Sequence, residues 1–138
     1  MNGIVFRTIA ALTLAGMPAA ALAAPVMLSA SLSGAAETAG GDADGKGSFT
    51  VEIDAESGDF CYSLSASDIG QPMAAHVHSG VAGTDGPPVV NLEMTSDECI
   101  AVEPSVLKPI VENPAGYYVN VHTAAYPKGA VRGQLVKK

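Results

Sequence analysis

Residues 49–65 read FTVEIDAESGDFCYSLS, and this stretch decides the fold class. Apolar and polar residues alternate over its first six positions, and they alternate again from Phe60 onward. Alternation with a period of two is typical of a β-strand that buries one face. The segment between the two alternating runs is short and contains Gly58, which suits a turn. The stretch therefore predicts a β-hairpin.

The rest of the chain continues this pattern, with short apolar segments separated by Gly, Pro, Asn and Asp. No helical period is sustained, although residues 105–111 are apolar at uneven spacing and predict one short helical turn. The sequence therefore predicts an all-β, single-domain, Greek-key β-sandwich or barrel of about eight strands. Besides the hairpin, strands are expected over residues 26–33, 74–78, 89–94, 98–102, 117–122 and 130–136.

The amino-terminal segment has the pattern of a secretory signal peptide. Arg7 precedes a mainly apolar run over residues 9–24, which is interrupted by Pro18 and contains the small-x-small site Ala-Leu-Ala. A membrane anchor is the alternative, but a spanning helix needs about 20 uninterrupted apolar residues. We expect residues 1–23 to be cleaved and residues 24–138 to form one periplasmic or secreted domain.

The charge of the chain excludes two classes of partner. The formal net charge is −7, and all 14 acidic residues lie within residues 24–138. Loss of Arg7 with the signal peptide would make the exported chain one unit more negative. Nucleic acid and anionic lipid both require a basic face, so we expect neither as a partner. No later segment resembles a membrane span, and the pattern predicts no oligomeric state.

The chain has two cysteines, Cys61 and Cys99. An even number of cysteines in an oxidising compartment favours a disulfide over free thiols. The alternative is a pair of thiolate metal ligands. A disulfide here would stabilise the fold by at most about 4 kcal/mol on the chain-entropy estimate.

All three histidines lie in two strand-like segments. His76 and His78 are two residues apart and therefore project from the same face of a strand. His122 shares a face with Tyr118 and Asn120 in the later segment. If the two strands are neighbours, three imidazoles converge, and imidazole nitrogen binds copper or zinc well. The alternative is that these are polar residues on a solvated face, or structural histidines held by hydrogen bonds.

Two further features border the histidine segments. Residues 79–88 form a glycine-rich loop that lacks the strand-then-helix setting of a phosphate loop, and a tight solvated turn is its simplest interpretation. Arg132 lies between apolar residues of a predicted strand, directly before Gly133, which indicates a guanidinium held in place. It has two candidate roles, a structural bond to a loop carbonyl or carboxylate, or guidance of an anion toward the histidines.

Several motifs, in this order, resemble the CHRD domain, which is named after chordin and also occurs alone in secreted bacterial proteins. The resemblance covers residues 28–136, and the cysteine within Phe-Cys-Tyr at 60–62 is similar to the bacterial form. The motifs lie at residues 75–80, 86–90, 118–123, 126–129 and 132–135.

A more distant likeness is to copper-containing superoxide dismutases, which also have a His-Val-His strand, a glycine-rich loop and a later Val-His strand. By this likeness His76, His78 and His122 are copper ligands, and Arg132 is the substrate-guiding arginine in a Gly-x-x-Arg stretch. Pro88 stands where those enzymes carry the histidine that bridges copper and zinc. The likeness therefore implies a copper site without zinc, in a fold that is immunoglobulin-like or superoxide-dismutase-like.

The leading hypothesis is an extracytoplasmic copper-binding CHRD domain, with copper-only superoxide dismutation as its candidate activity. A small anion such as superoxide would enter an open coordination position. One alternative is a non-catalytic copper carrier, although the chain has no methionine cluster typical of such carriers. Another is an adhesion module whose histidine face binds a protein or a matrix.

Overall fold

The computed structural model describes residues 23–138. The predicted signal peptide, residues 1–23, lies outside the described residues except for Ala23. The elements in chain order are β1 (Val26–Ser33), η1 (Gly34–Ala36), β2 (Lys46–Asp54), β3 (Asp59–Ser67), β4 (Pro72–Ser79), β5 (Pro88–Leu92), β6 (Glu98–Ala101), α1 (Pro104–Glu112), η2 (Pro114–Gly116), β7 (Tyr117–Thr123), β8 (Val131–Gln134) and β9 (Val136–Lys137).

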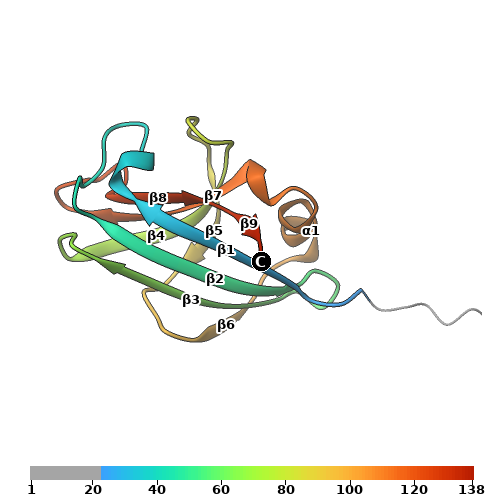
Figure 1. Ribbon diagram of the computed structural model, residues 1–138. Coiled ribbons are helices and arrows are strands. Elements are labelled where there is room, and N and C mark those ends of the chain that lie inside the picture. The colour runs from blue at the N-terminus through green and yellow to red at the C-terminus, as the bar shows by residue number, and fades with distance from the viewer. Residues whose placement is uncertain (1–22) are drawn as a thin grey trace, which may run out of the picture.

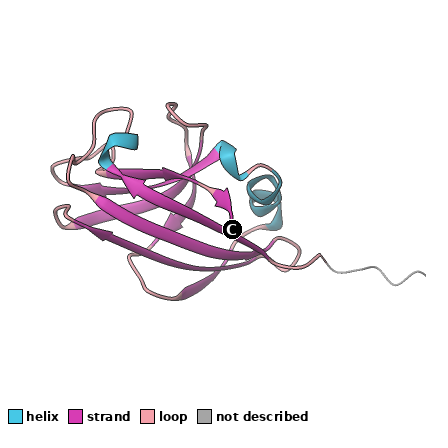
Figure 2. Ribbon diagram, viewed as in Figure 1, coloured by secondary structure: helices cyan, strands magenta, loops and turns pink. Residues whose placement is uncertain are grey.

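The strands form one antiparallel sheet that curls on itself (Figure 1). The strand order is β5-β4-β7-β8-β1-β2-β3-β6, and β9 pairs with β1. One residue pair, Ser33 with Arg132, joins β1 to β8 at the middle of this order. The sheet therefore divides into two layers, β5-β4-β7-β8 and β1-β2-β3-β6, which share one core (Figure 2). The prediction of an all-β, single-domain, sandwich-like fold is confirmed.

The chain crosses between the layers after β3, after β5 and after β6. As a result β7 lies beside β4 rather than beside β6, and β6 lies beside β3. Crossings of this kind are the connections of a Greek key. For function, the important consequence is that the two histidine-bearing strands, β4 and β7, are direct neighbours.

The alternating side chains of the hairpin form the centre of the core. Phe49 on β2 and Phe60 and Tyr62 on β3 are at most 2% exposed, with ring centroids 5.6–6.3 Å apart. The predicted hairpin is confirmed, since β2 pairs with β3 from Lys46 to Asp54. Burial of apolar side chains on alternate positions is the main force that stabilises such a layer.

The predicted disulfide is also confirmed. Cys61 on β3 and Cys99 on β6 lie directly opposite each other and are bonded. The bond fastens the short edge strand β6 to the sheet. It lies in the layer opposite to the one that carries the histidines.

The predicted helical turn at residues 105–111 is a longer helix, α1, which covers one end of the sandwich (Figure 1). Leu107 and Ile110 are completely buried and fasten it to the core. The sequence pattern underestimates the length of the helix, because its apolar residues are unevenly spaced and Pro109 interrupts its hydrogen bonding. Pro104 begins the helix, at a position where proline is tolerated. Among residues 23–138, no helix combines the length and apolar character needed to cross a bilayer.

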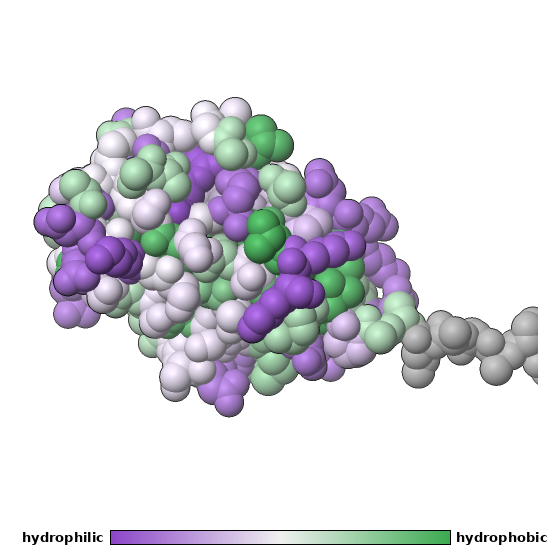
Figure 3. Space-filling view, viewed as in Figure 1, coloured by the Kyte–Doolittle hydropathy of each residue, from purple (hydrophilic) through white to green (hydrophobic). Residues whose placement is uncertain are grey.

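Hydrophilic side chains lie at both ends of the face shown in Figure 3, and a mixture of hydrophilic, weakly polar and hydrophobic side chains lies between them.

Candidate metal centre

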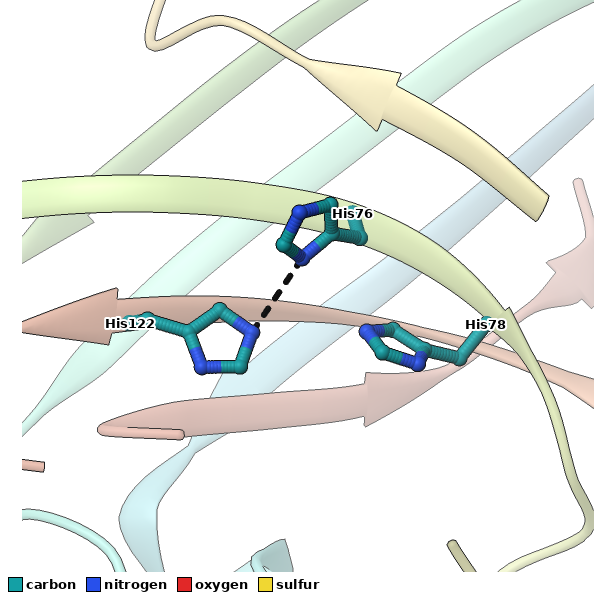
Figure 4. Close-up of side chains that lie close together, drawn as sticks. All are labelled: His76, His78 and His122. Carbon is teal, nitrogen blue, oxygen red and sulfur yellow. Dashed lines mark hydrogen bonds between the residues drawn. The ribbon is translucent and has the colours of Figure 1, made fainter. Parts of the chain in front are cut away.

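The pairing of β4 with β7 brings the three histidines together. Ala74 pairs with His122, and His76 pairs with Asn120, so the three imidazoles project from one face of the two strands. One ring nitrogen from each of His76, His78 and His122 lies within 4.8 Å of the others. Figure 4 shows the rings facing a common space. Among residues 23–138 this is the one group of three or more candidate metal-binding side chains.

Backbone carbonyls fix which nitrogen two of the rings offer. His78 Nδ1 lies 2.8 Å from the carbonyl oxygen of Gly86, and His122 Nδ1 lies 3.0 Å from that of Pro127. A carbonyl only accepts hydrogen bonds, so each Nδ1 must carry the proton. In the neutral rings both Nε2 atoms are therefore unprotonated, and hydrogen bonds from the other ring nitrogen to carbonyls are common among histidines that bind metals.

The third ring, that of His76, faces the other two with Nδ1 rather than with Nε2. His76 Nδ1 lies 3.2 Å from His122 Nε2, and in the metal-free protein it donates a hydrogen bond to that atom. His78 Nε2 is buried and has no hydrogen-bond partner. An unpartnered buried nitrogen is costly unless something else binds it. The nitrogens that could hold an ion are thus Nε2 of His78 and His122 together with Nδ1 of His76 once that atom has lost its proton.

The surroundings favour the neutral form of two of these rings. Burial lowers the pKa of His76, and the nearby His122 and His78 lower it further. Burial also lowers the pKa of His78, although its bond to Gly86 acts in the opposite direction. Because only a neutral imidazole can coordinate a metal, both shifts favour the protonation state that a metal ligand needs.

The face carrying these histidines is covered rather than solvated. Tyr118 and Asn120, which the sequence places on the same face as His122, are each only 2% exposed. The glycine-rich loop closes over them, since the amide of Gly86 donates a hydrogen bond to the hydroxyl of Tyr118 at 3.3 Å. Strand β7 is therefore buried on both sides, and the loop is a cover for the site as well as a turn.

Arg132 holds this loop in place. Its guanidinium is 1% exposed and donates hydrogen bonds to Asp85 Oδ1 at 3.1 Å, to the carbonyl of Thr84 at 2.7 Å and to that of Val81 at 3.1 Å. The group also lies 3.4 Å from the centre of the Tyr118 ring. Of the two roles that the sequence leaves open, the burial and these bonds favour the structural one.

Sequence reasoning missed Glu37, which lies beside Arg132 and is only 8% exposed. Burial raises its pKa to about 7, against the lowering effect of the Arg132 charge. A single glutamate in the polar segment after η1 has no sequence pattern that would reveal its burial. The burial of Glu37 depends on tertiary structure. The hydroxyl of the adjacent Thr38 donates a hydrogen bond to Asp85, which ties this segment to the covering loop.

The histidine site opens on one side into an apolar hollow of about 600 Å³. His76 and His122 line it and are partly exposed, whereas His78 is buried deeper. The other lining residues are Met73, Ala74, Thr123, Ala124 and Pro127. A small molecule or a protein side chain can therefore approach the histidines from this side only through apolar surroundings.

Comparison with known proteins places the chain in a family. The model of the CHRD domain matches residues 28–135, which include the three histidines, Arg132 and the disulfide. No curated protein and no solved structure matches the chain significantly. Since the match spans most of the sequence and all strands from β2 to β8, the chain belongs to the CHRD domain family.

Proposed function

We propose that this chain is an extracytoplasmic copper-binding protein whose ion is held by His76, His78 and His122. The observation that carries the proposal is the geometry of the donor atoms. Two rings are oriented by backbone carbonyls, and the buried Nε2 of His78 has no partner within the protein. A site built in this way fits an ion that accepts three imidazole nitrogens.

The chemistry of the donors favours copper over zinc. The cluster contains imidazoles without carboxylate or thiolate. Such nitrogen donors bind Cu²⁺ more tightly than the other divalent first-row ions, including Zn²⁺. Bound copper would supply one-electron redox chemistry. The residues of the chain hold the ring tautomers, exclude water from the side of His78 and leave access through the apolar hollow.

The disulfide and the family support a location outside the cytoplasm. Structural disulfides persist in oxidising compartments, and Cys61 and Cys99 are bonded. Cleavage after Ala23 would release the domain into the periplasm or the medium, and amino-terminal sequencing of the exported protein tests this part of the proposal.

Metal analysis of the exported protein tests copper binding. We expect one copper ion per chain, and loss of that ion in the His78→Ala variant. Asn91→Ala is the matched control, because Asn91 is exposed and pairs with His76 from the other neighbouring strand, β5. Exported protein that takes up no copper would instead favour an adhesion module that binds a protein or a matrix.

Superoxide dismutation is the second candidate function. The accessible edges of His76 and His122 at the hollow favour it, because a redox enzyme must leave room for its substrate at the ion. Against anion guidance, the charge of Arg132 is buried and bonded to Asp85. A superoxide assay of copper-loaded protein decides the question, and tight copper binding without turnover would identify a carrier.

A further inference from the structure

Met73 occupies an unusual position beside the histidine site. The register between β4 and β7 shifts between Pro72 and Ala74, so Met73 is the additional residue of a β-bulge. Bulges of this kind are common next to active sites, where they redirect a side chain. Met73 is also 70% exposed, although its side chain is apolar.

The hollow that exposes His76 and His122 is also lined by Met73. The remaining lining residues supply no competing ligand. Ala74, Ala124 and Pro127 have no side-chain donor atom, and Thr123 Oγ1 accepts a hydrogen bond from the amide of Tyr126. The thioether sulfur of Met73 is therefore the uncommitted soft donor atom at the open side of the site.

We propose that Met73 is a fourth ligand, which binds the ion in its reduced state, Cu(I), together with the three histidines. This inference rests on the proposed copper site. Thioether sulfur is a soft ligand that selects Cu(I), whereas imidazole serves both oxidation states. Methionine has three rotatable bonds, so a side chain at the rim of the hollow can turn toward the ion without a change in the strand.

The Met73→Leu variant tests the inference, because leucine conserves the apolar volume and removes the sulfur. Met94→Leu is the matched control. Met94 is 37% exposed and lines a neighbouring groove together with Met73, but it does not line the histidine hollow. Affinity for Cu(I) is measured with ascorbate as reductant and a chromophoric Cu(I) chelator as competitor, and affinity for Cu(II) is measured separately.

We expect Met73→Leu to weaken Cu(I) binding on the order of tenfold or more, a typical cost of losing a contact at a metal site. Cu(II) binding should be unchanged, and X-ray absorption should show a sulfur neighbour of Cu(I) in the unmodified protein and in Met94→Leu only. Unchanged Cu(I) affinity in Met73→Leu, or absence of sulfur in the unmodified protein, would overturn the inference while leaving the histidine site intact. Unmodified protein that binds neither ion would overturn both proposals.

A separate observation concerns the buried carboxyl of Glu37. Glu37 Oε1 and Asn120 Oδ1 are both buried without a hydrogen-bond partner, and the two side chains lie within reach of each other. While Glu37 is ionised, Asn120 can satisfy it only through its amide NH2 group, an interaction that lowers the pKa of Glu37 and leaves Asn120 Oδ1 without a partner. The charged groups that face Glu37 are Arg132 and Asp85, and these already form an ion pair.

We infer that Glu37 is a neutral carboxylic acid in the folded protein under mildly acidic conditions, because its buried Oε1 has no partner and the neighbouring Arg132 is already bonded to Asp85 and to two loop carbonyls. The proton removes a buried charge that has no counter-charge of its own. Gly129 makes room for this arrangement, since a Cβ at that position would collide with the carboxyl group of Glu37. Burial raises the pKa of Glu37 to about 7, in agreement with the geometry.

Infrared spectroscopy of metal-free protein tests this inference through the carbonyl band of a protonated carboxyl group. We expect the band at pH 6, its disappearance with a midpoint near pH 7, and its absence from Glu37→Gln. Glu52→Gln, which changes an exposed glutamate on β2, should keep it. Absence of the band from the unmodified protein at pH 6, or its persistence in Glu37→Gln, would overturn the inference.

Discussion

The ring of His78 stacks on the ring of Tyr118, with centroids 4.9 Å apart and an angle of 7° between the planes. The guanidinium of Arg132 also lies against the Tyr118 ring, 3.4 Å from its centre, and it holds the loop carbonyls of Val81 and Thr84. The orientation of a candidate ligand is therefore linked to the covering loop through one aromatic ring.

The stack predicts a difference between two substitutions of Tyr118. Tyr118→Phe keeps the ring and loses only the hydrogen bond from Gly86, so its copper affinity should stay within about threefold and its stability should fall by about 1 kcal/mol. Tyr118→Leu removes the stacking surface and should weaken copper binding by roughly tenfold, the order seen for residues that orient a ligand. Copper titrations and urea unfolding of the two variants check this. Equal copper affinities in Phe and Leu variants would show that the stack does not orient His78.

Arg132 should act on stability rather than on encounter with an anion. Arg132→Lys keeps the positive charge but cannot reproduce the hydrogen bonds to Asp85, Val81 and Thr84. We expect it to lower the free energy of unfolding by about 2–3 kcal/mol, because the buried charged group at this position loses its hydrogen bonds to the loop. Chemical denaturation measures this change. A variant that is as stable as the unmodified protein, but whose superoxide turnover loses its dependence on ionic strength, would support the guidance role.

Reduction of the disulfide should separate stability from metal binding. Cys61 and Cys99 lie in the layer opposite to the histidines, so the double variant to Ser should lose at most about 4 kcal/mol of stability. Its copper affinity, measured at a temperature where it is folded, should equal that of the unmodified protein. A large loss of copper affinity in the folded double variant would contradict this prediction, because it would mean that the disulfide in one layer affects the histidines in the other.

Acid should destabilise the metal-free protein through His76 and His78. The pKa values of both are lowered in the folded state, chiefly by burial, so the unfolded chain binds more protons as the pH falls below about 6.5. Stability contributed by these neutral rings is present above that pH and is lost as the pH falls toward their folded pKa values. Glu37 has the opposite effect between pH 4.5 and about 7, because its pKa is raised. The free energy of unfolding of Glu37→Gln should therefore fall as the pH drops below 6.5, because of the two histidines. A free energy of unfolding that stays constant below pH 6.5 in this variant would contradict their contribution.

The sequence predicts the features that depend on local periodicity. Alternation in residues 49–65 identifies the hairpin and its buried aromatic side chains, and the two-residue spacing of His76 and His78 places both rings on one face. Pairing of β4 with β7 is a long-range event that no local pattern specifies. The sequence therefore predicts that His122 meets the other two histidines only if the two strands are neighbours, and the structure shows that they are.

Tertiary packing decides what the sequence leaves open or misses. Whether Arg132 faces the site or the loop depends on where residues 80–87 fold, and this is set by bonds between segments that are distant in the chain. Burial of Glu37 depends on the same loop, and the exposure of Met73 depends on a bulge that appears only when the register of two strands is known. Each of these features involves charge or backbone irregularity rather than hydrophobic pattern.

Copper titration of the metal-free protein, followed by electron paramagnetic resonance, tests the central claim most directly. The account predicts one Cu(II) ion per chain with a spectrum dominated by imidazole nitrogen, and a loss of affinity in each of His76→Ala, His78→Ala and His122→Ala. The losses should not be additive, because the three rings act as one site. Full copper affinity in the His122→Ala variant would contradict the three-histidine site.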